Sequence, residues 1–242
     1  MDEKAQRFDF QTTHWSLVLE AGLRSSPDSR QALARLCEAY WCPLYFYVRR
    51  RVGDSHKAED LTQEFFTRLL DKDVVATANP YRGRFRSFLL TSLKNFLSNE
   101  WDKAKAQKRG GGRLLISLDF DKANSRMKFD AADNETPERL YERQWTMTLL
   151  ELVMSRLRSE SAAANKEEQF ELLKSFITGG KSTSGYADVA ARLQMSETAA
   201  KAAAHRLRNR YRQLLRQEIA QTVAGPDDVD DEIRRLFKSL ES

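Results

Sequence analysis

Apolar residues recur every three or four positions over much of the first hundred residues, a spacing that predicts amphipathic helices. The first such segment spans residues 33–52 and contains Pro43, so we expect its helix to kink or restart there. A second helix begins near Ser55, which can cap it, and a third runs from about Phe85 to Lys105. The second helix has a buried stripe at Ala58, Leu61, Phe65 and Leu69 and a polar face at Asp60, Gln63, Glu64 and Thr67. The inward face of the third helix comprises Phe85, Phe88, Leu89, Ser92 and Phe96.

The rest of the chain predicts more helices after a polar stretch at residues 106–137, which we expect to be a linker. Thr136 and Pro137 form the start signal of a long helix. Its inward residues are Leu140, Trp145, Leu149, Leu152, Val153 and Leu157. Shorter helices are expected at about 166–178 and 184–193, followed by a longer helix at 197–220.

Residues 186–208 have the pattern of a helix-turn-helix motif. Gln194, Met195 and Ser196 make the turn, and Ser196 caps the second helix. The residues expected to pack inward are Val189, Ala190, Leu193, Ala200, Ala203 and Leu207. The outer face of the second helix is expected to present Thr198, Lys201, Ala202, His205, Arg206 and Arg208, as a recognition helix does toward the major groove. The alternative is a helical hairpin with a cationic exposed face.

The composition fits an all-α fold of two small domains. Only 5 of the 242 residues are Pro and 10 are Gly, too few for a chain that turns between many short strands. The expected organisation is an N-terminal extension (1–30), a first helical domain (31–105), the linker (106–137), a helix-turn-helix domain (138–220) and an acidic extension (221–242). The extension is expected to end in a short amphipathic helix with its stripe at Ile233, Leu236, Phe237 and Leu240.

The net charge of +5 is unevenly distributed. Residues 81–113 contain nine basic and two acidic side chains, and residues 201–216 contain six basic side chains and no acidic one. Two basic runs about 100 residues apart indicate two contacts with a polyanion such as DNA, whereas the acidic helix near Asp60 suits a basic or polar partner. Each run taken alone also fits a solvated helix face.

Few residues suit metal or nucleophilic chemistry. Cys37 and Cys42 lack zinc-ligand spacing, and we interpret both as reduced core residues. We therefore expect no metal, no cofactor and no enzymatic activity. The N-terminal residues lack a secretory pattern and no apolar run is long enough to span a bilayer, so we expect a cytoplasmic protein.

Four strings in this order resemble the bacterial extracytoplasmic-function (ECF) sigma factors of RNA polymerase. They are Tyr40–Tyr45 with Arg49–Arg51, the A-E-D-L-T-Q-E-F-F string at 58–66, the Phe85–Leu89 string leading to the basic run at 103–109, and the closing helix-turn-helix. The segment Thr12–Ser16 and the C-terminal extension resemble a planctomycete-type subgroup.

The resemblance implies two domains, sigma-two-like and sigma-four-like, with three binding surfaces. Binding to core RNA polymerase falls to Asp60, Gln63, Glu64 and Arg68. Recognition and melting of the minus-ten promoter element fall to Lys94, Asn95, Asn99, Trp101, Lys103, Lys105 and Arg109. Recognition of the minus-thirty-five element in promoter DNA falls to Ser196, Thr198, Lys201, His205, Arg206 and Arg208. An anti-sigma or other regulatory protein is a further expected partner.

Three alternatives stay open at this stage. A stand-alone helix-turn-helix regulator would bind duplex DNA without polymerase, but it needs neither the acidic helix face nor the aromatic basic helix. A nucleic-acid enzyme could use Glu59, Asp60 and Glu64 to bind a metal, yet no second acidic cluster or phosphate-binding loop accompanies them. A sigma-like scaffold that no longer opens promoters is the third, because the recognition helix is rich in alanine.

Overall fold

The computed structural model describes residues 41–70, 84–106, 118, 120, 123–124, 135–177, 185–223 and 225–241. The expected N-terminal extension, most of the linker, Cys37 and Arg109 lie outside these residues. Over the described residues the expected all-α fold is confirmed, and none of them lies in a strand.

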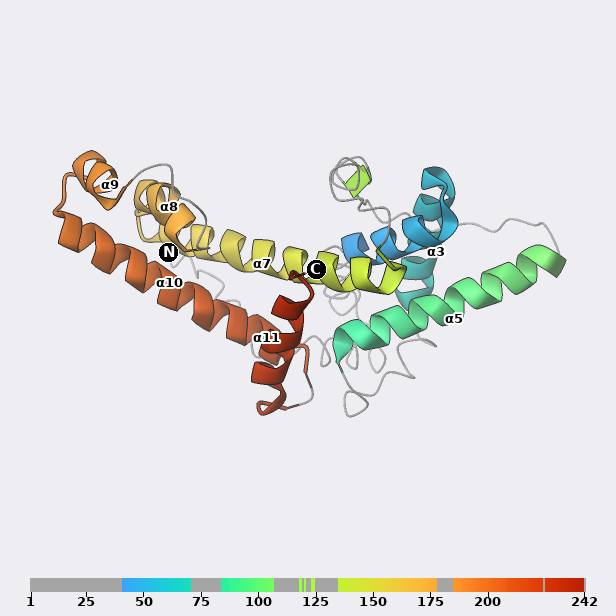
Figure 1. Cartoon of the computed structure of the whole chain (residues 1–242). Helices are drawn as coiled ribbons and strands as arrows, with labels where there is room; N and C mark the ends of the chain where they lie inside the picture. The colour runs from blue at the N-terminus through green and yellow to red at the C-terminus, as the bar shows by residue number, and fades with distance from the viewer. Residues whose placement is uncertain are drawn as a thin grey trace, which may run out of the picture. The chain divides into compact units, whose positions relative to one another are not determined.

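The helices follow the predicted order closely (Figure 1). Residues 41–52 are helical through Pro43, so no restart is observed at this proline. The later elements are α3 (Ser55–Leu70), α5 (Phe85–Ala106), α7 (Pro137–Ala163), α8 (Glu167–Leu173), the 3-10 helix η2 (Lys174–Phe176), α9 (Tyr186–Arg192), α10 (Glu197–Ala220) and α11 (Asp228–Lys238).

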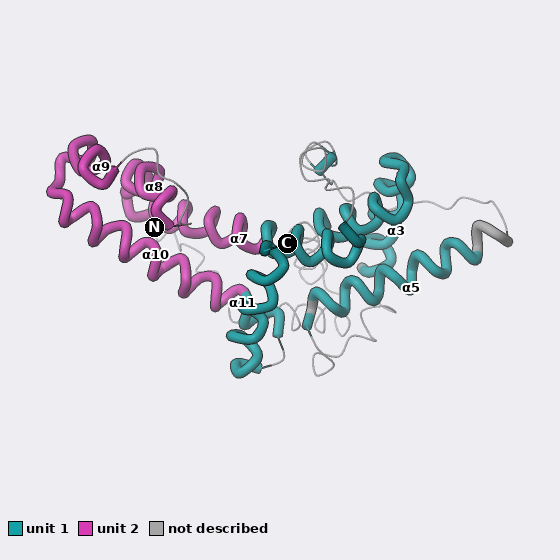
Figure 2. The backbone as a smooth tube through the Cα atoms, in the orientation of Figure 1, with its two compact units in different colours: residues 1–148, 219–242 teal, residues 149–218 magenta. Residues whose placement is uncertain are grey.

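The helices group into two compact units whose boundaries differ from the expected domain limits (Figure 2). Unit 1 comprises residues 1–148 and 219–242, and unit 2 comprises residues 149–218. The start of α7 and the acidic extension therefore belong to unit 1, together with α3 and α5. The assignment of the expected domains to separate functions stays a prediction.

Unit 1 is built around large aromatic and aliphatic side chains. Phe65 on α3 lies 5.8 Å from Phe96 on α5, measured between ring centroids. Trp145 and Tyr141 on α7 are fully enclosed, with 1% and 0% of their surface exposed. Burial also raises the pKa of the Tyr141 hydroxyl, which donates a hydrogen bond to the Arg86 backbone carbonyl at 2.8 Å. This apolar burial is the main source of stability for the unit.

Local signals at the helix ends explain where α3 and α7 begin. Gly53 adopts φ +81° and donates to the carbonyl of Arg49 at 3.0 Å, which closes the preceding helix. Asp54, rather than the expected Ser55, caps α3, because its carboxylate accepts a hydrogen bond from the Lys57 N–H at 2.7 Å. Thr136 caps α7 as expected, at 3.3 Å from the Arg139 N–H.

The C-terminal helix α11 is held on unit 1 by a buried carboxylate. Glu232 is 1% exposed and accepts hydrogen bonds from Arg86 at 2.6 and 3.3 Å. Arg84 forms a second ion pair with the same carboxylate, and Arg86 forms another with Glu142 on α7. Because α11 closes this network, the acidic extension is an integral part of unit 1.

The expected stripe of α11 was therefore placed partly on the wrong face. Val229, Glu232 and Leu236 are buried, whereas Phe237 is 42% exposed and Ile233 is half-buried. The apolar pattern alone favoured Phe237, but the ion pairs with Arg84 and Arg86 turn Glu232 inward and rotate the helix accordingly.

Unit 2 contains two tight turns of the same design. The left-handed residues Asn165 (φ 54°) and Gln194 (φ 51°) follow α7 and α9, respectively. In each turn the backbone N–H of the following residue donates a hydrogen bond to a carbonyl in the last turn of the helix. The Lys166 N–H donates to the Ser161 carbonyl at 2.8 Å, and the Met195 N–H donates to the Ala190 carbonyl at 3.0 Å. This Schellman geometry usually employs glycine at the left-handed position. Because Asn165 and Gln194 occupy that position here, the sequence carried no glycine signal for these two turns.

Replacing Glu232 with Gln should destabilise unit 1, because it leaves the nearby guanidinium groups without their buried counter-charge. We expect the free energy of unfolding to fall by about 3 kcal/mol. Denaturant titration followed by circular dichroism measures the change. Asp231→Asn is the matched control, since Asp231 pairs with Arg234 on the exposed side of α11 and should cost at most about 1 kcal/mol. Equal effects of the two substitutions would contradict a structural role for the buried carboxylate.

Candidate nucleic-acid interface

The polar face of α3 is less exposed than the sequence suggested. Asp60 is exposed, whereas Gln63, Glu64 and Arg68 are half-buried. Arg68 pairs with Glu64 at 2.6 Å and with Glu100 on α5 at 2.8 Å, and its guanidinium lies 4.9 Å from the Phe96 ring centroid. Arg68 therefore connects α3 to α5 within unit 1. Asp60 is the most accessible of the four residues expected to bind polymerase.

The exposed face of α5 brings together three of the residues expected at the minus-ten element. Lys94, Asn95 and Asn99 are all exposed along one stretch of this helix. Their amide and ammonium groups can donate hydrogen bonds to bases and phosphates.

Lys94 has a counter-charge within unit 1. Its ammonium lies 2.8 Å from the Glu138 carboxylate and 5.7 Å from the Tyr47 ring centroid. The hydrogen bond from Lys94 lowers the pKa of Glu138. A phosphate that binds Lys94 must therefore compete with Glu138.

Trp101 has one ring face covered. It is half-buried, and the Arg51 guanidinium lies 5.3 Å from its ring centroid, in a cation–π contact. Base stacking on that face would require Arg51 to move. Lys103 and Lys105 lie on the last turns of α5, but their side chains fall outside the described residues, as does the whole of Arg109.

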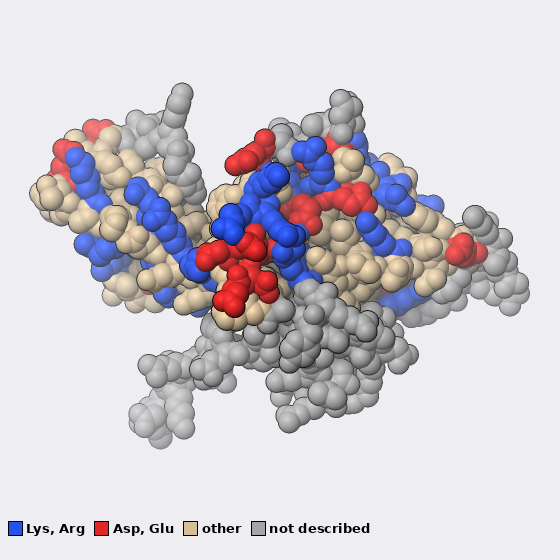
Figure 3. Space-filling model, turned by 60° about the horizontal axis from the view of Figure 1, so that its bottom comes forward, with Lys and Arg blue, Asp and Glu red and all other residues tan. Residues whose placement is uncertain are grey.

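The first basic run is divided between two roles. Arg84 and Arg86 face the Glu232 carboxylate in the interior of unit 1, so they do not belong to an outward basic surface. On the face shown in Figure 3, Lys and Arg side chains form separate groups, and Asp and Glu side chains lie beside several of them. The sequence charge of this run therefore overstates the cationic surface that it presents.

In unit 2, α9 and α10 form the expected helix-turn-helix arrangement. Ser196 caps α10 by accepting a hydrogen bond from the Ala199 N–H at 3.2 Å. Val189, Ala203 and Ala204 pack with Leu173 in a buried cluster, and Leu193 and Leu207 lie against it. Five of the residues expected on the outer face of the second helix are exposed, namely Thr198, Lys201, Ala202, His205 and Arg206.

Arg208 does not share this outer face. It is half-buried and donates to the backbone carbonyl of Phe176 in η2 at 3.0 Å. The helical period predicted that Arg208 points outward. The period carries no information on the Phe176 carbonyl, which accepts a hydrogen bond from Arg208. Its contribution to DNA binding stays a prediction.

Two further arginines, Arg210 of the second basic run and Arg156 of α7, form ion pairs inside unit 2. Arg210 forms two hydrogen bonds of 2.8 Å with Glu160 on α7, and this pairing raises the pKa of Arg210. Arg156 on α7 bonds the nearly buried Glu218 on α10 at 2.8 Å. Sequence reasoning missed these pairs, since partners 50 and 62 residues apart leave no local signal.

Among the residues that the structure describes, no cluster of three or more His, Cys, Asp or Glu side chains has metal-site geometry. No described helix has the length and apolarity needed to span a membrane.

Comparison with known proteins then assigns the first helical region. Residues 36–107, which include α3 and α5, match the family model of sigma-70 region 2. This segment is similar to sigma-70 region 2. The chain is also 32% identical over 89 residues to the ECF RNA polymerase sigma factor BldN of Streptomyces coelicolor.

The similarity to BldN covers 36% of this chain and 33% of BldN, so the chain aligns with about a third of that relative's length. No solved structure matches the chain. The resemblance to ECF sigma factors is confirmed on the region 2 segment, while the planctomycete-type subgroup stays a prediction.

Removing the counter-charge of Lys94 should strengthen DNA binding if Lys94 contacts phosphates. We expect Glu138→Gln to raise the affinity for single-stranded DNA at low salt by about two- to fivefold, the equivalent of one surface ion pair. Fluorescence anisotropy with a labelled oligonucleotide measures the effect. In the double variant Glu138→Gln/Lys94→Ala the gain should vanish, and a gain that persists would exclude Lys94 as its cause.

The two arginines of α10 should behave differently. Arg206→Ala should leave the stability within about 0.5 kcal/mol and reduce the salt dependence of duplex binding by about one unit of slope. Arg208→Ala should instead lower the free energy of unfolding by about 1 to 2 kcal/mol, because it removes a charge-assisted hydrogen bond to Phe176. Denaturant titration and salt-dependent anisotropy on both variants test this division, and identical profiles would contradict it.

Proposed function

We propose that this chain is an ECF-type sigma factor, a non-enzymatic subunit that binds core RNA polymerase and directs it to promoter DNA in the cytoplasm. The observation that carries the proposal is the region 2 match on residues 36–107, the segment that holds both α3 and α5. A helix-turn-helix in unit 2, in the order seen along the chain, supplies a second DNA-binding element.

Core polymerase would bind the polar face of α3. The contact residues proposed are Asp60, Gln63, Glu64 and Arg68. Asp60 supplies the exposed negative charge, which favours a basic protein surface and disfavours DNA. Glu64 and Arg68 are already paired, so they would present a fixed, nearly neutral polar surface rather than two free charges.

The minus-ten element would bind the exposed face of α5. Asn95 and Asn99 would read base edges, while Lys94 and the cations after Trp101 would hold phosphates. Melting would be stabilised by capture of unpaired bases, whose unstacking costs a few kcal/mol, without an energy-consuming step. Trp101 would stack on a base once Arg51 releases its ring.

The minus-thirty-five element would be read by α10 through Lys201, His205 and Arg206, with Ser196 and Thr198 near the backbone. Ala200 and Ala203 are buried at 0% and 3%, so packing against α9 requires small residues there. With few hydrogen-bond donors left on the outer face, we infer that thymine methyl contacts and groove shape supply part of the specificity. An anti-sigma or other regulatory protein is a further proposed partner.

A run-off transcription assay with purified core polymerase and a pool of promoter fragments tests the function. Addition of the wild-type chain should produce discrete start sites. Asp60→Arg should weaken the complex with core polymerase by about tenfold or more, because it places a positive charge against the proposed basic surface of the polymerase. Asp227→Arg, at an exposed acidic position outside region 2, is the charge-matched control and should behave as wild type.

The assay also separates the alternatives. A stand-alone helix-turn-helix regulator would bind duplex DNA yet form no complex with core polymerase in gel filtration. A sigma-like scaffold would form that complex without producing transcripts. Either result would contradict the proposal.

A further inference from the structure

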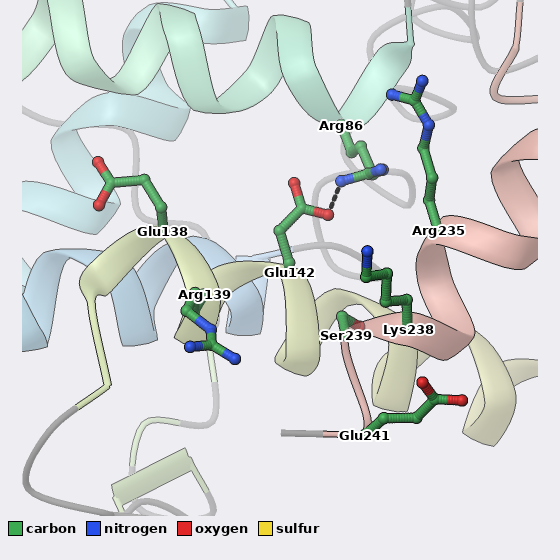
Figure 4. Close-up of a pocket in the computed structure, with 8 residues that line it drawn as sticks. All are labelled: Arg86, Glu138, Arg139, Glu142, Arg235, Lys238, Ser239 and Glu241. Atoms are coloured by element: carbon green, nitrogen blue, oxygen red, sulfur yellow. Dashed lines mark ion pairs between the residues drawn. The ribbon is translucent and has the colours of Figure 1, made fainter.

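Unit 1 contains a pocket of about 590 Å³ that region 2 alone does not complete. Its walls come from the start of α5, the start of α7 and the C-terminal part of α11 (Figure 4). Arg86 lies on the first of these segments, Glu138, Arg139 and Glu142 on the second, and Arg235 and Lys238 on the third. The pocket therefore exists only when the C-terminal extension is docked.

The carboxylates of the pocket are largely neutralised by other contacts. Glu142 pairs with Arg86, as the dashed line in Figure 4 marks, and Glu138 pairs with Lys94 at 2.8 Å. Arg86 is in turn bonded to Glu232. These groups form the fixed wall of the pocket and have little charge left to offer a ligand.

Three cations of the pocket have no such partner. Arg139, Arg235 and Lys238 are exposed, and among the described residues none of them forms an ion pair. In Figure 4, Lys238 points from α11 toward the Arg86–Glu142 pair, Arg235 extends beside the start of α5, and Arg139 points away from the pair on the α7 side. Glu241 is the one carboxylate of the lining that is left to oppose them, so the accessible groups carry an excess of positive charge.

Helix electrostatics explain only part of this arrangement. Arg235 and Lys238 lie in the last turn of α11, where the helix dipole favours cations. Arg139 lies in the first turn of α7, where the dipole disfavours a cation and favours an anion. An anion bound between Arg235 and Lys238 would be attracted by both cations, and Arg139 adds positive charge on the α7 side of the lining.

We propose that this pocket binds two or more neighbouring phosphate groups. Arginine guanidinium groups bind phosphate oxygens with paired hydrogen bonds, and lysine adds a point charge. The volume exceeds what one phosphate needs and falls in the range of about 300 to 1,000 Å³ typical of ligand pockets. Consecutive phosphates of a DNA strand and a free polyphosphate share this chemistry. The proposal gives α11 a binding role beyond its structural one.

The test uses the full chain without polymerase, so its outcome is independent of whether the chain initiates transcription. The probes are sodium pyrophosphate, followed by isothermal titration calorimetry, and a fluorescein-labelled 20-nucleotide single strand, followed by anisotropy at low salt. Arg235→Ala/Lys238→Ala should weaken binding by about tenfold, the effect of losing one to two charge-assisted contacts. Circular dichroism and denaturant titration establish that each variant is folded.

Arg234→Ala/Lys57→Ala is the charge-matched control. Both residues are exposed and neither lines the pocket, because Arg234 pairs with Asp231 on the outer side of α11 and Lys57 lies on α3. Its affinity for both probes should stay within about twofold of wild type, since the net charge change is the same but the pocket is intact.

The two probes also identify the source of the phosphates. Loss of pyrophosphate binding, with or without loss of DNA binding, supports a site for a free polyphosphate. Loss confined to the oligonucleotide supports a contact with the DNA backbone. Wild-type binding of neither probe, unchanged binding by Arg235→Ala/Lys238→Ala, or an equal loss in the control variant would overturn the proposal.

Discussion

The buried pairing of Glu232 with Arg84 and Arg86 is the interaction on which the architecture of unit 1 depends. It joins the start of α5 to a helix that lies 146 residues later in the sequence. Arg86 extends the network to Glu142 on α7, and its backbone carbonyl accepts the Tyr141 hydroxyl. Because isolated buried charges are costly, all members of this network must be present together. The packing of the matched segment 36–107 is therefore completed by residues that lie outside it.

Both basic runs show that charge counted along a sequence is an upper limit on the charge that a surface presents. Arg84 and Arg86 in the first run, and Arg208 and Arg210 in the second, bind partners within their own units. Among the described residues of the two runs, fewer cations therefore remain on the surface than the sequence count suggests.

Much of the fold follows from the sequence, because helix boundaries and apolar stripes are local properties. The periodic pattern predicted α3, α5, α7, α9 and α10, and Thr136 and Ser196 cap helices as expected. The errors lie where distant residues decide. The face of α11 was misplaced because Glu232 has its partners on α5, and Arg208 turned inward because a carbonyl of η2 accepts its hydrogen bond. The pocket beside α11 had no sequence signal for the same reason.

The long sequence separation within the network also sets an order of events during synthesis. A ribosome adds roughly 5 to 20 residues per second, so Arg86 is made about 7 to 30 s before Glu232. During that interval Arg84 and Arg86 lack their buried partner, and the start of α5 cannot reach its final packing. Unit 2 lies within residues 149–218, and its Arg156–Glu218 pair spans 62 residues, so this pair waits less than half as long. The segment 36–107 can thus complete its packing only after unit 2 has been synthesised, although it is made first.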